Sequence, residues 1–370
     1  MQTQTKPKKE SAWVWLGSNG LRLLVSIAVP VITFIIMRWG FMFLRDSQAP
    51  KLIIALVAIV WGVGGVAILY ILMNWVVEQL PDDWTRRVQP FVFIGPAMAI
   101  LAWFLLIPTV RTLYLSFLNR NSTEFVGFAN YIAAFTERSM IESFRNNLLW
   151  ILVGTSACVI LGLLIAILAD RSSFESIAKS LIFLPMAISF VGAGVIWRFI
   201  YYYRPANQVQ IGLLNAIVVG LGGQPQAWTT LIQPWNNLFL ILAGVWLQTG
   251  FAMVVFSSAL KGVPEDLLEA ARVDGANEIQ IFFRIIIPQI KGTIITVTTT
   301  IVIFFLKIFD IVIVMTGGQY GTEVIGTQFY RQFFSNRNFG YGSAIAIILL
   351  IAVIPVMIYN LKQFGEREAF

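Results

Sequence analysis

Five residues inside long apolar stretches carry side chains suited to binding a polar solute within a membrane: Ser189, Gln248, Phe251, Lys307 and Asp310. Polar groups at membrane depth are costly, so they usually face a cavity or pair with one another. A site for a neutral polyhydroxyl solute needs amides, hydroxyls and aromatic faces together. Gln248 and Phe251 lie about one helical turn apart, so one helix supplies an amide and a ring. These five residues are predicted to line a substrate path.

The same residues also have structural interpretations. Gln248 can hydrogen-bond to a neighbouring helix, and Phe251 can simply pack in the core. Lys307 and Asp310 are spaced i, i+3, so they can pair on one helical face and neutralise each other. Ser189 lies in the middle of its apolar stretch. For Gln248 and for the Lys307–Asp310 pair, the sequence leaves both interpretations open.

The composition excludes several kinds of catalytic and cofactor site. The 370-residue chain has no histidine, which removes histidine-ligated metals, Ser-His catalysis and histidine proton relays. Its single cysteine, Cys158, cannot form an intramolecular disulfide. No Gly-Lys pair occurs in the sequence, so there is no P-loop to bind ATP phosphates. We therefore expect no catalytic residues, no metal site, no cofactor and no enzyme activity in this chain.

Hydrophobic residues make up 58% of the chain and charged residues only 12%, against about 25% charged in ordinary globular domains. Eight stretches are long enough to span a bilayer: residues 21–44, 52–77, 91–117, 148–169, 181–203, 238–260, 292–315 and 341–361. The sequence therefore predicts an all-α, polytopic membrane helical bundle with about eight transmembrane helices. The net charge of +7 is scattered over loops, so no nucleic-acid partner is expected.

The polar segment between the sixth and seventh spans, residues 261–291, is predicted to form a helix, a tight turn and a second helix. Pro264 suits the first position of a helix, and Gly275 suits the left-handed conformation that ends one. Asn277, with a glutamine three residues later, forms the pattern of a helix cap and its reciprocal partner. Pro288 predicts that the second helix stops before it. Such a short rigid unit can act as a lever, and the alternative is a plain connecting loop.

The same segment resembles the EAA loop of bacterial ABC importer permeases, through Glu269-Ala270-Ala271, then Gly275, then Ile287-Pro288. In that family the loop is a coupling helix that docks into a cleft of a separate ATPase subunit. The resemblance assigns ATPase coupling to Glu269, Ala270, Ala271, Asp274, Gly275 and Pro288. The absence of a P-loop agrees with this, because the energy would then enter through a partner.

Other motifs extend the resemblance to carbohydrate-uptake permeases, among them residues 125–131 and the Thr316-Gly317-Gly318 turn. The resemblance covers about residues 91–365, and the two helices before it are similar to those of a maltose-permease type of subunit. We therefore expect a cytoplasmic tail at residues 1–20, two leading transmembrane helices at 21–90, and a six-helix permease core at 91–365. The coupling loop, 261–291, lies within that core.

The resemblance implies a permease subunit of an ATP-driven importer that moves a sugar or sugar-like osmolyte, such as an oligosaccharide or a glycosylglycerol, by alternating access. It implies a multi-pass protein of the bacterial cytoplasmic (inner) membrane with both termini in the cytoplasm. The implied partners are a second permease subunit, two ATP-binding subunits that hold ATP and Mg²⁺, an extracytoplasmic substrate-binding protein and the lipid bilayer. The alternative is an ion-coupled secondary transporter of a small polar solute, for which Asp310 is the one convincing intramembrane carboxylate.

Overall fold

Helices account for nearly all of the regular structure. The computed structural model describes residues 12–78, 82–231 and 233–368. Within these ranges there is no β-strand, only an isolated antiparallel bridge between Leu118 and Phe125. The predicted all-α class is confirmed.

The first unit of the chain, residues 1–109, is a set of long helices with largely exposed apolar side chains. It contains α1 (Ala12–Asp46), α2 (Lys51–Glu78), α3 (Asp82–Leu101) and a π-helical turn, η1 (Ala102–Leu106). Helix α2 packs against both α1 and α3. Because helix α1 begins at Ala12, it includes part of the expected tail at residues 1–20, and residues 1–11 lie outside the described ranges. An apolar surface of this kind is compatible with a lipid environment.

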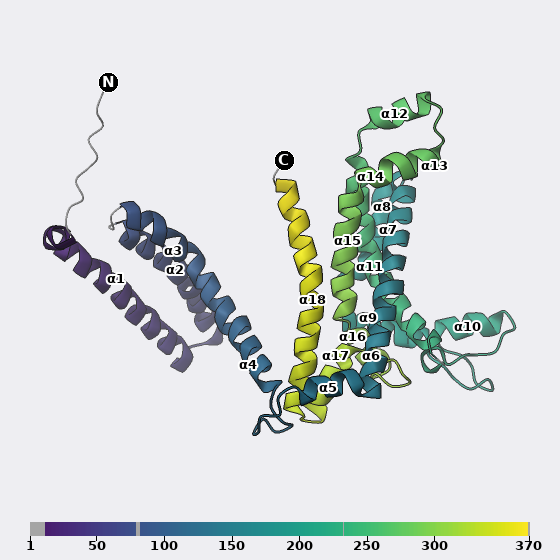
Figure 1. The fold of residues 1–370 in the computed structure, drawn as a ribbon, viewed down its shortest axis with the longest axis horizontal. Coiled ribbons are helices and arrows are strands. Elements are labelled where there is room, and N and C mark those ends of the chain that lie inside the picture. Colours follow the sequence, from purple (N-terminus) through teal and green to yellow (C-terminus); the bar gives the residue numbers. More distant parts are fainter. Residues whose placement is uncertain (1–11, 79–81, 232, 369–370) are drawn as a thin grey trace. The chain divides into compact units, whose positions relative to one another are not determined.

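The second unit, residues 110–370, holds the coupling segment and the expected substrate path. Its elements are α4 (Ile107–Leu115, which begins in the first unit), α5 (Ala129–Thr136), α6 (Arg138–Leu149), η2 (Trp150–Gly154), α7 (Thr155–Asp170), α8 (Glu175–Phe183), η3 (Leu184–Ala187), α9 (Phe190–Ile200), α10 (Leu213–Gly220), η4 (Trp228–Thr230), α11 (Trp235–Lys261), α12 (Glu265–Val273), α13 (Glu278–Ile281), η5 (Phe282–Ile286), α14 (Ile287–Gln289), α15 (Lys291–Leu306), α16 (Asp310–Met315), α17 (Ile325–Tyr330), η6 (Arg331–Ser335) and α18 (Phe339–Glu368). Helices α12 and α13 lie at one end of this unit, and α5 and α17 lie at the opposite end (Figure 1).

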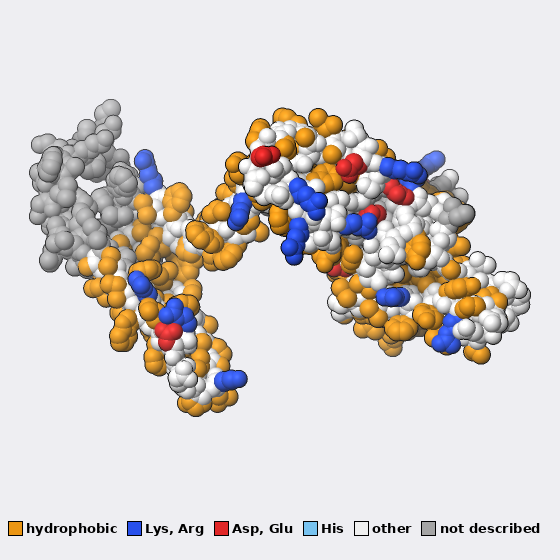
Figure 2. Space-filling view, turned by 90° about the horizontal axis from the view of Figure 1, so that it is seen from below, with side chains coloured by type: hydrophobic (Ala, Val, Ile, Leu, Met, Phe, Trp, Pro, Cys, Tyr) orange, Lys and Arg blue, Asp and Glu red, His pale blue; other side chains and the backbone are white. Residues whose placement is uncertain are grey.

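The core of the second unit forms around α11, the most deeply buried of its long helices. Helix α7 packs closely along it, because a small residue stands where the backbones approach: a Cβ on Gly162 would lie 2.5 Å from the Cβ of Ala252. Trp150 and Phe305 pack against each other in the same buried cluster, with ring centroids 5.7 Å apart. Seen from the α5–α17 end, charged side chains gather on this unit while hydrophobic side chains lie around its margin (Figure 2). This distribution fits a bundle whose ends face water and whose flanks face lipid.

Two of the eight predicted spans are not continuous helices. Five described helices are long and apolar enough to cross a membrane, or seven if two bent helix pairs each count as one span. The expected span at 21–44 lies within the single helix α1, some of whose side chains fall outside the described part of the structure, so these counts do not include it. The expected span at 181–203 is broken by a bend of 102° between η3 and α9. The expected span at 292–315 is also not one helix, since it divides into α15 and α16 at residues 307–309.

Candidate functional site

Helix α12 presents the residues expected to couple to an ATPase on the surface at one end of the second unit (Figure 1). Pro264 precedes the helix and Glu265 and Asp266 occupy its first turn, where carboxylates favour the positive end of the helix dipole. Glu269 and Ala270 are exposed, and the adjoining Ala271 is partly covered. Small alanine side chains on an exposed face let a partner surface approach the helix backbone closely.

The turn after α12 has the predicted chemistry. Asp274 forms the C-cap of α12, and Gly275 follows with φ of +85°, a conformation that glycine adopts without steric cost. The backbone N–H of Gln280 donates to Asn277 Oδ1 over 2.8 Å, and the N–H of Asn277 donates to Gln280 Oε1 over 2.9 Å. This reciprocal capping box starts α13 and confirms the predicted helix–turn–helix.

Two details of the segment differ from the prediction. Pro264 is the N-cap of α12, with an extended ψ of 129°, and not the first helical residue. Pro288 does not stop the second helix, which continues as a π-helical turn, Phe282–Ile286, and then as α14 up to Gln289. A π-helical turn widens the backbone, so the proline is accommodated two residues before the chain bends by 70° into α15.

Ion pairs connect α12 and α13 to the end of α7. The guanidinium of Arg272 donates to Glu278 over 3.0 Å, and Arg171 lies 3.8 Å from the other oxygen of the same carboxylate. The hydrogen bond to Glu278 raises the pKa of Arg272 above its ordinary value. Exposed pairs of this kind contribute little stability individually; Glu278 thus lies between a cation of α12 and the cation that follows α7.

On α11, Gln248 and Phe251 differ in what surrounds them. Gln248 is half-buried, and its side-chain amide makes no hydrogen bond within the described residues. Of the two interpretations that the sequence left open, the interhelical hydrogen bond is therefore not formed among the described residues, and the role in the substrate path stays a prediction. Phe251 packs against the main hydrophobic cluster, which agrees with the packing interpretation for that ring.

Ser189 does not lie in the middle of a continuous span. It is the N-cap of α9, at the 102° bend, and its hydroxyl accepts a hydrogen bond of 3.1 Å from the N–H of Gly192. Serine is a favoured N-cap residue because it satisfies one of the free N–H groups of the first turn. The expectation of a mid-helix position was wrong because the sequence shows apolar length but not the bend.

Lys307 and Asp310 do not share a helical face. Lys307 is the C-cap of α15 and Asp310 is the first residue of α16. Neither residue forms an ion pair or a side-chain hydrogen bond within the described ranges, so the predicted i, i+3 pair on one helix is wrong. Lys307 is exposed and lies at the edge of an apolar groove of about 560 Å³, which Phe309 and Tyr330 also line.

The two broken spans meet near their breaks. Phe190, next to Ser189, contacts Phe304 near the end of α15, with ring centroids 5.1 Å apart. Helix α9 packs along α16, where Val314 lies close to Gly194. The structure therefore brings the region of Ser189 to the region of Lys307 and Asp310, although these residues are far apart in sequence.

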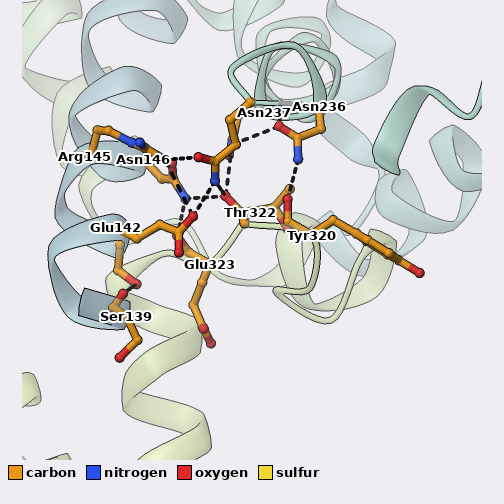
Figure 3. A network of polar contacts seen from close by, with 12 residues as sticks. Ser139, Glu142, Arg145, Asn146, Asn236, Asn237, Tyr320, Thr322 and Glu323 are labelled. Carbon is orange, nitrogen blue, oxygen red and sulfur yellow. Dashed lines mark hydrogen bonds and ion pairs between the residues drawn. The ribbon is translucent and has the colours of Figure 1, made fainter. Parts of the chain in front are cut away.

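A network of asparagines that are not among the predicted site residues holds the loop after α16 (Figure 3). The buried amide of Asn146 donates to the carbonyl oxygens of Gly321 and Glu323, each over 2.8 Å. Asn236, at the start of α11, donates to the carbonyl of Tyr320 over 2.6 Å. The side chain of Tyr320 points away from this network (Figure 3). The available sequence signal is that two Asn-Asn pairs, 146–147 and 236–237, each lie just before or at the start of an apolar stretch.

Glu323 is a buried carboxylate at the edge of this network, on the loop between α16 and α17. Its side chain lies 2.7 Å from Arg331, and burial raises its pKa to about 7 against the attraction of that guanidinium. The nearby carboxylate of Glu142 raises the pKa further. Glu142 itself accepts a hydrogen bond from Gln233 over 2.6 Å and lies 3.6 Å from Arg145.

The sequence and the fold are both similar to those of known membrane transport proteins. The chain is 54% identical over 277 residues to the osmoprotective compounds uptake permease protein of Synechocystis sp., covering 75% of this chain and 99% of that protein. It is 50% identical over 285 residues to the alpha-glucoside transport system permease protein of Rhizobium meliloti, covering 77% and 84% respectively. The fold is similar to a crystal structure of a bacterial ABC transporter involved in the import of the acidic polysaccharide alginate. That likeness has a TM-score of 0.65 at 21% identity and covers 76% of this chain and 97% of the other.

Residues 132–364 match the family described as the binding-protein-dependent transport system inner membrane component. This range includes α12, both broken spans and the asparagine network. The match agrees with the absence of a P-loop, because in such systems the ATPase is a separate subunit and the membrane component is not an enzyme. The chain therefore belongs to the family of inner-membrane permease components of binding-protein-dependent ABC importers.

Proposed function

We propose that this chain is one of the two permease subunits of an ATP-driven importer for a neutral glycosylated solute, such as an α-glucoside or a glycosylglycerol-type osmolyte. The observation that carries the solute class is the 54% and 50% identity to permeases named for osmoprotective compounds and for α-glucosides. The unpaired amide of Gln248 fits this class, because an uncharged donor and acceptor suits sugar hydroxyls.

The coupling role rests on α12. In this proposal Glu269, Ala270 and Ala271 face a cleft of an ATP-binding subunit, which carries the ATP and Mg²⁺. Asp274, Gly275 and Pro288 set the direction in which the helix leaves the membrane. When ATP draws the two ATP-binding subunits together, α12 moves with its subunit and the broken spans rock between inward- and outward-facing arrangements. The end that carries α12, together with both chain termini, then faces the cytoplasm.

The remaining partners follow from the same scheme. A second permease subunit completes the path, and an extracytoplasmic binding protein delivers the solute at the α5–α17 end. A structure of the alginate transporter is described as a complex with an alginate pentasaccharide-bound periplasmic protein, which supports a partner of that type here. Gln248, Phe251, Ser189, Lys307 and Asp310 are proposed to line or border the path.

The test is reconstitution of the chain with its co-expressed partner subunits in vesicles, followed by uptake of a radiolabelled α-glucoside and of a glycosylglycerol. Uptake that survives collapse of ion gradients but stops on ATP depletion supports the proposal, and the reverse result supports an ion-coupled carrier. Gln248→Ala is expected to raise the half-saturation concentration about three- to tenfold, since one or two neutral hydrogen bonds are lost. Gln224→Ala, in an exposed loop, is the control. Unchanged kinetics for Gln248→Ala would remove that residue from the path.

A further inference from the structure

A cluster of ion pairs joins the ends of α7, α8 and α11 beside the coupling segment. Lys179 of α8 pairs with Asp170, the last residue of α7, and with Glu175 in the first turn of α8. Lys179 also bonds to the hydroxyl of Ser257 in α11, and that hydroxyl lies 2.7 Å from Asp170. Lys261, the last residue of α11, pairs with the same Glu175 carboxylate. We call these five residues the end lattice.

The inner part of the end lattice is shielded from solvent. The side chains of Lys179 and Asp170 are only 16% and 17% exposed, whereas that of Lys261 is 56% exposed. Removing one partner of a buried pair is strongly destabilising, but replacing both partners by neutral groups is often tolerated. A variant that lacks both charges can therefore fold normally, and its transport activity then reports what the charges contribute to helix movement.

The end lattice adjoins two of the connections between α12 and the membrane helices; a third runs through α13 and α14 into α15. The first of these two connections is covalent: the chain leaves α11 at Lys261, and Gly262 and Val263 then lead to α12. The second connection runs through Arg171, which directly follows Asp170 and pairs with Glu278 at the start of α13.

Close packing carries the same three helices toward the expected substrate path. A Cβ on Gly250 of α11 would lie 2.6 Å from the carbonyl oxygen of Ile182 in α8. Gly250 is two residues from Gln248 in the sequence, and Ala252 is four residues from it. A Cβ built on Gly162 of α7 would lie 2.5 Å from the Cβ of Ala252. Helices α7, α8 and α11 are thus held together both near Gln248 and at their ends.

We propose that the end lattice makes α7, α8 and α11 move as one body with α12, and that Lys179 is the positioning residue on which this depends. The inference rests on the proposed function, because it concerns how motion of the coupling helix reaches the path. Lys179 acts through Asp170, Glu175 and Ser257 and does not touch the solute or ATP.

The experiment measures ATP hydrolysed per solute imported by the reconstituted complex, with and without binding protein. Lys179→Met leaves the shielded Asp170 without a cation and Glu175 with Lys261 alone. It is expected to lower thermal stability and to raise the ATP-to-solute ratio about fivefold or more. The double variant Asp170→Asn/Lys179→Met removes the charged pair together. It is expected to recover the stability of the wild type while its ratio stays high. Lys179→Arg, which keeps the charge, should recover coupling in part.

Arg138→Gln is the matched control, because Arg138 is an exposed cation at the opposite end of the unit and forms no ion pair in the described ranges. Its ratio should equal that of the wild type. A double variant that is stable and fully coupled would overturn the inference. Should Lys179→Met fail to assemble, Glu175→Gln gives the same comparison at a more exposed site, and normal coupling there would also count against the end lattice. Absence of ATP-dependent uptake in the wild type would instead contradict the proposed function.

Discussion

The side-chain amide of Asn147 donates a hydrogen bond of 3.1 Å to the carbonyl oxygen of Leu306, the last residue of α15. The carbonyl oxygen of the same amide accepts a hydrogen bond of 2.7 Å from the N–H of Ile325, at the start of α17. One buried side chain therefore joins the end of α15, next to Lys307, to the start of α17. In a broken span the free backbone groups at the break must find partners inside the protein.

Asn147→Ala is expected to destabilise the protein by about 1–3 kcal/mol, because it leaves the backbone groups of Leu306, at the break, and of Ile325, at the start of α17, without their buried partner. The measurement is thermal unfolding of the purified protein in detergent. Asn207→Ala, at an exposed loop position, is the control and should leave the melting temperature unchanged. Equal melting temperatures for the two variants would show that Asn147 does not hold the break.

Glu323 should make stability depend on pH. Its pKa is raised from 4.5 to about 7 by burial, so between these values the folded state holds a proton that the unfolded state has lost. Stability therefore falls as pH rises from about 4.5 to 7 and stays lower above that range.

Glu323→Gln removes this ionisation. At pH 5 the variant should have nearly the melting temperature of the wild type. At pH 8 its free energy of unfolding should exceed that of the wild type by about 1–3 kcal/mol, because a pKa shift of one unit corresponds to about 1.36 kcal/mol. Arg331, Glu142 and Arg145 are the charged groups around it, and only the first pairs with it directly. A stability difference that is independent of pH would contradict the raised pKa.

Substitutions at Gly275 should act through backbone conformation alone. A Cβ at this position would meet no atom within 4 Å, but φ is +85°, and a left-handed conformation costs an L-residue about 1–2 kcal/mol. Asparagine tolerates this region better than a β-branched residue does. We expect Gly275→Asn to retain much of the coupling between ATP hydrolysis and uptake, and Gly275→Val to lose it.

The measurement for Gly275 is the ATP-to-solute ratio, together with co-purification of the ATP-binding subunit. Gly220→Ala is the control, because that glycine also has open space around it but has an ordinary φ. Equal ratios for the asparagine and valine variants would argue that the turn does not direct α12.

Lys307 and Asp310 should behave as independent charges. They are separated by the break between α15 and α16 and form no ion pair with each other. In a double-mutant cycle with Lys307→Gln and Asp310→Asn, the coupling energy for unfolding should stay within about 0.5 kcal/mol. A coupling energy well above that value would restore the ion pair that the sequence suggested.

The helices and their local ends were largely determined by the sequence, because capping and turn chemistry act over a few residues. Asn277 and Gln280 form the predicted capping box, and Gly275 has the predicted left-handed conformation. The exclusion of a P-loop and the all-α class also follow from residue types alone.

Only the tertiary structure decided where the apolar stretches break and what their polar residues contact. A stretch such as 292–315 is apolar along its whole length, so hydropathy predicts one helix. At the actual break between α15 and α16, the amide of Asn147, which is distant in sequence, donates to the freed carbonyl oxygen of Leu306. For the same reason the partners of Lys179 on three helices could not be predicted, since burial and charge pairing depend on contacts between distant segments.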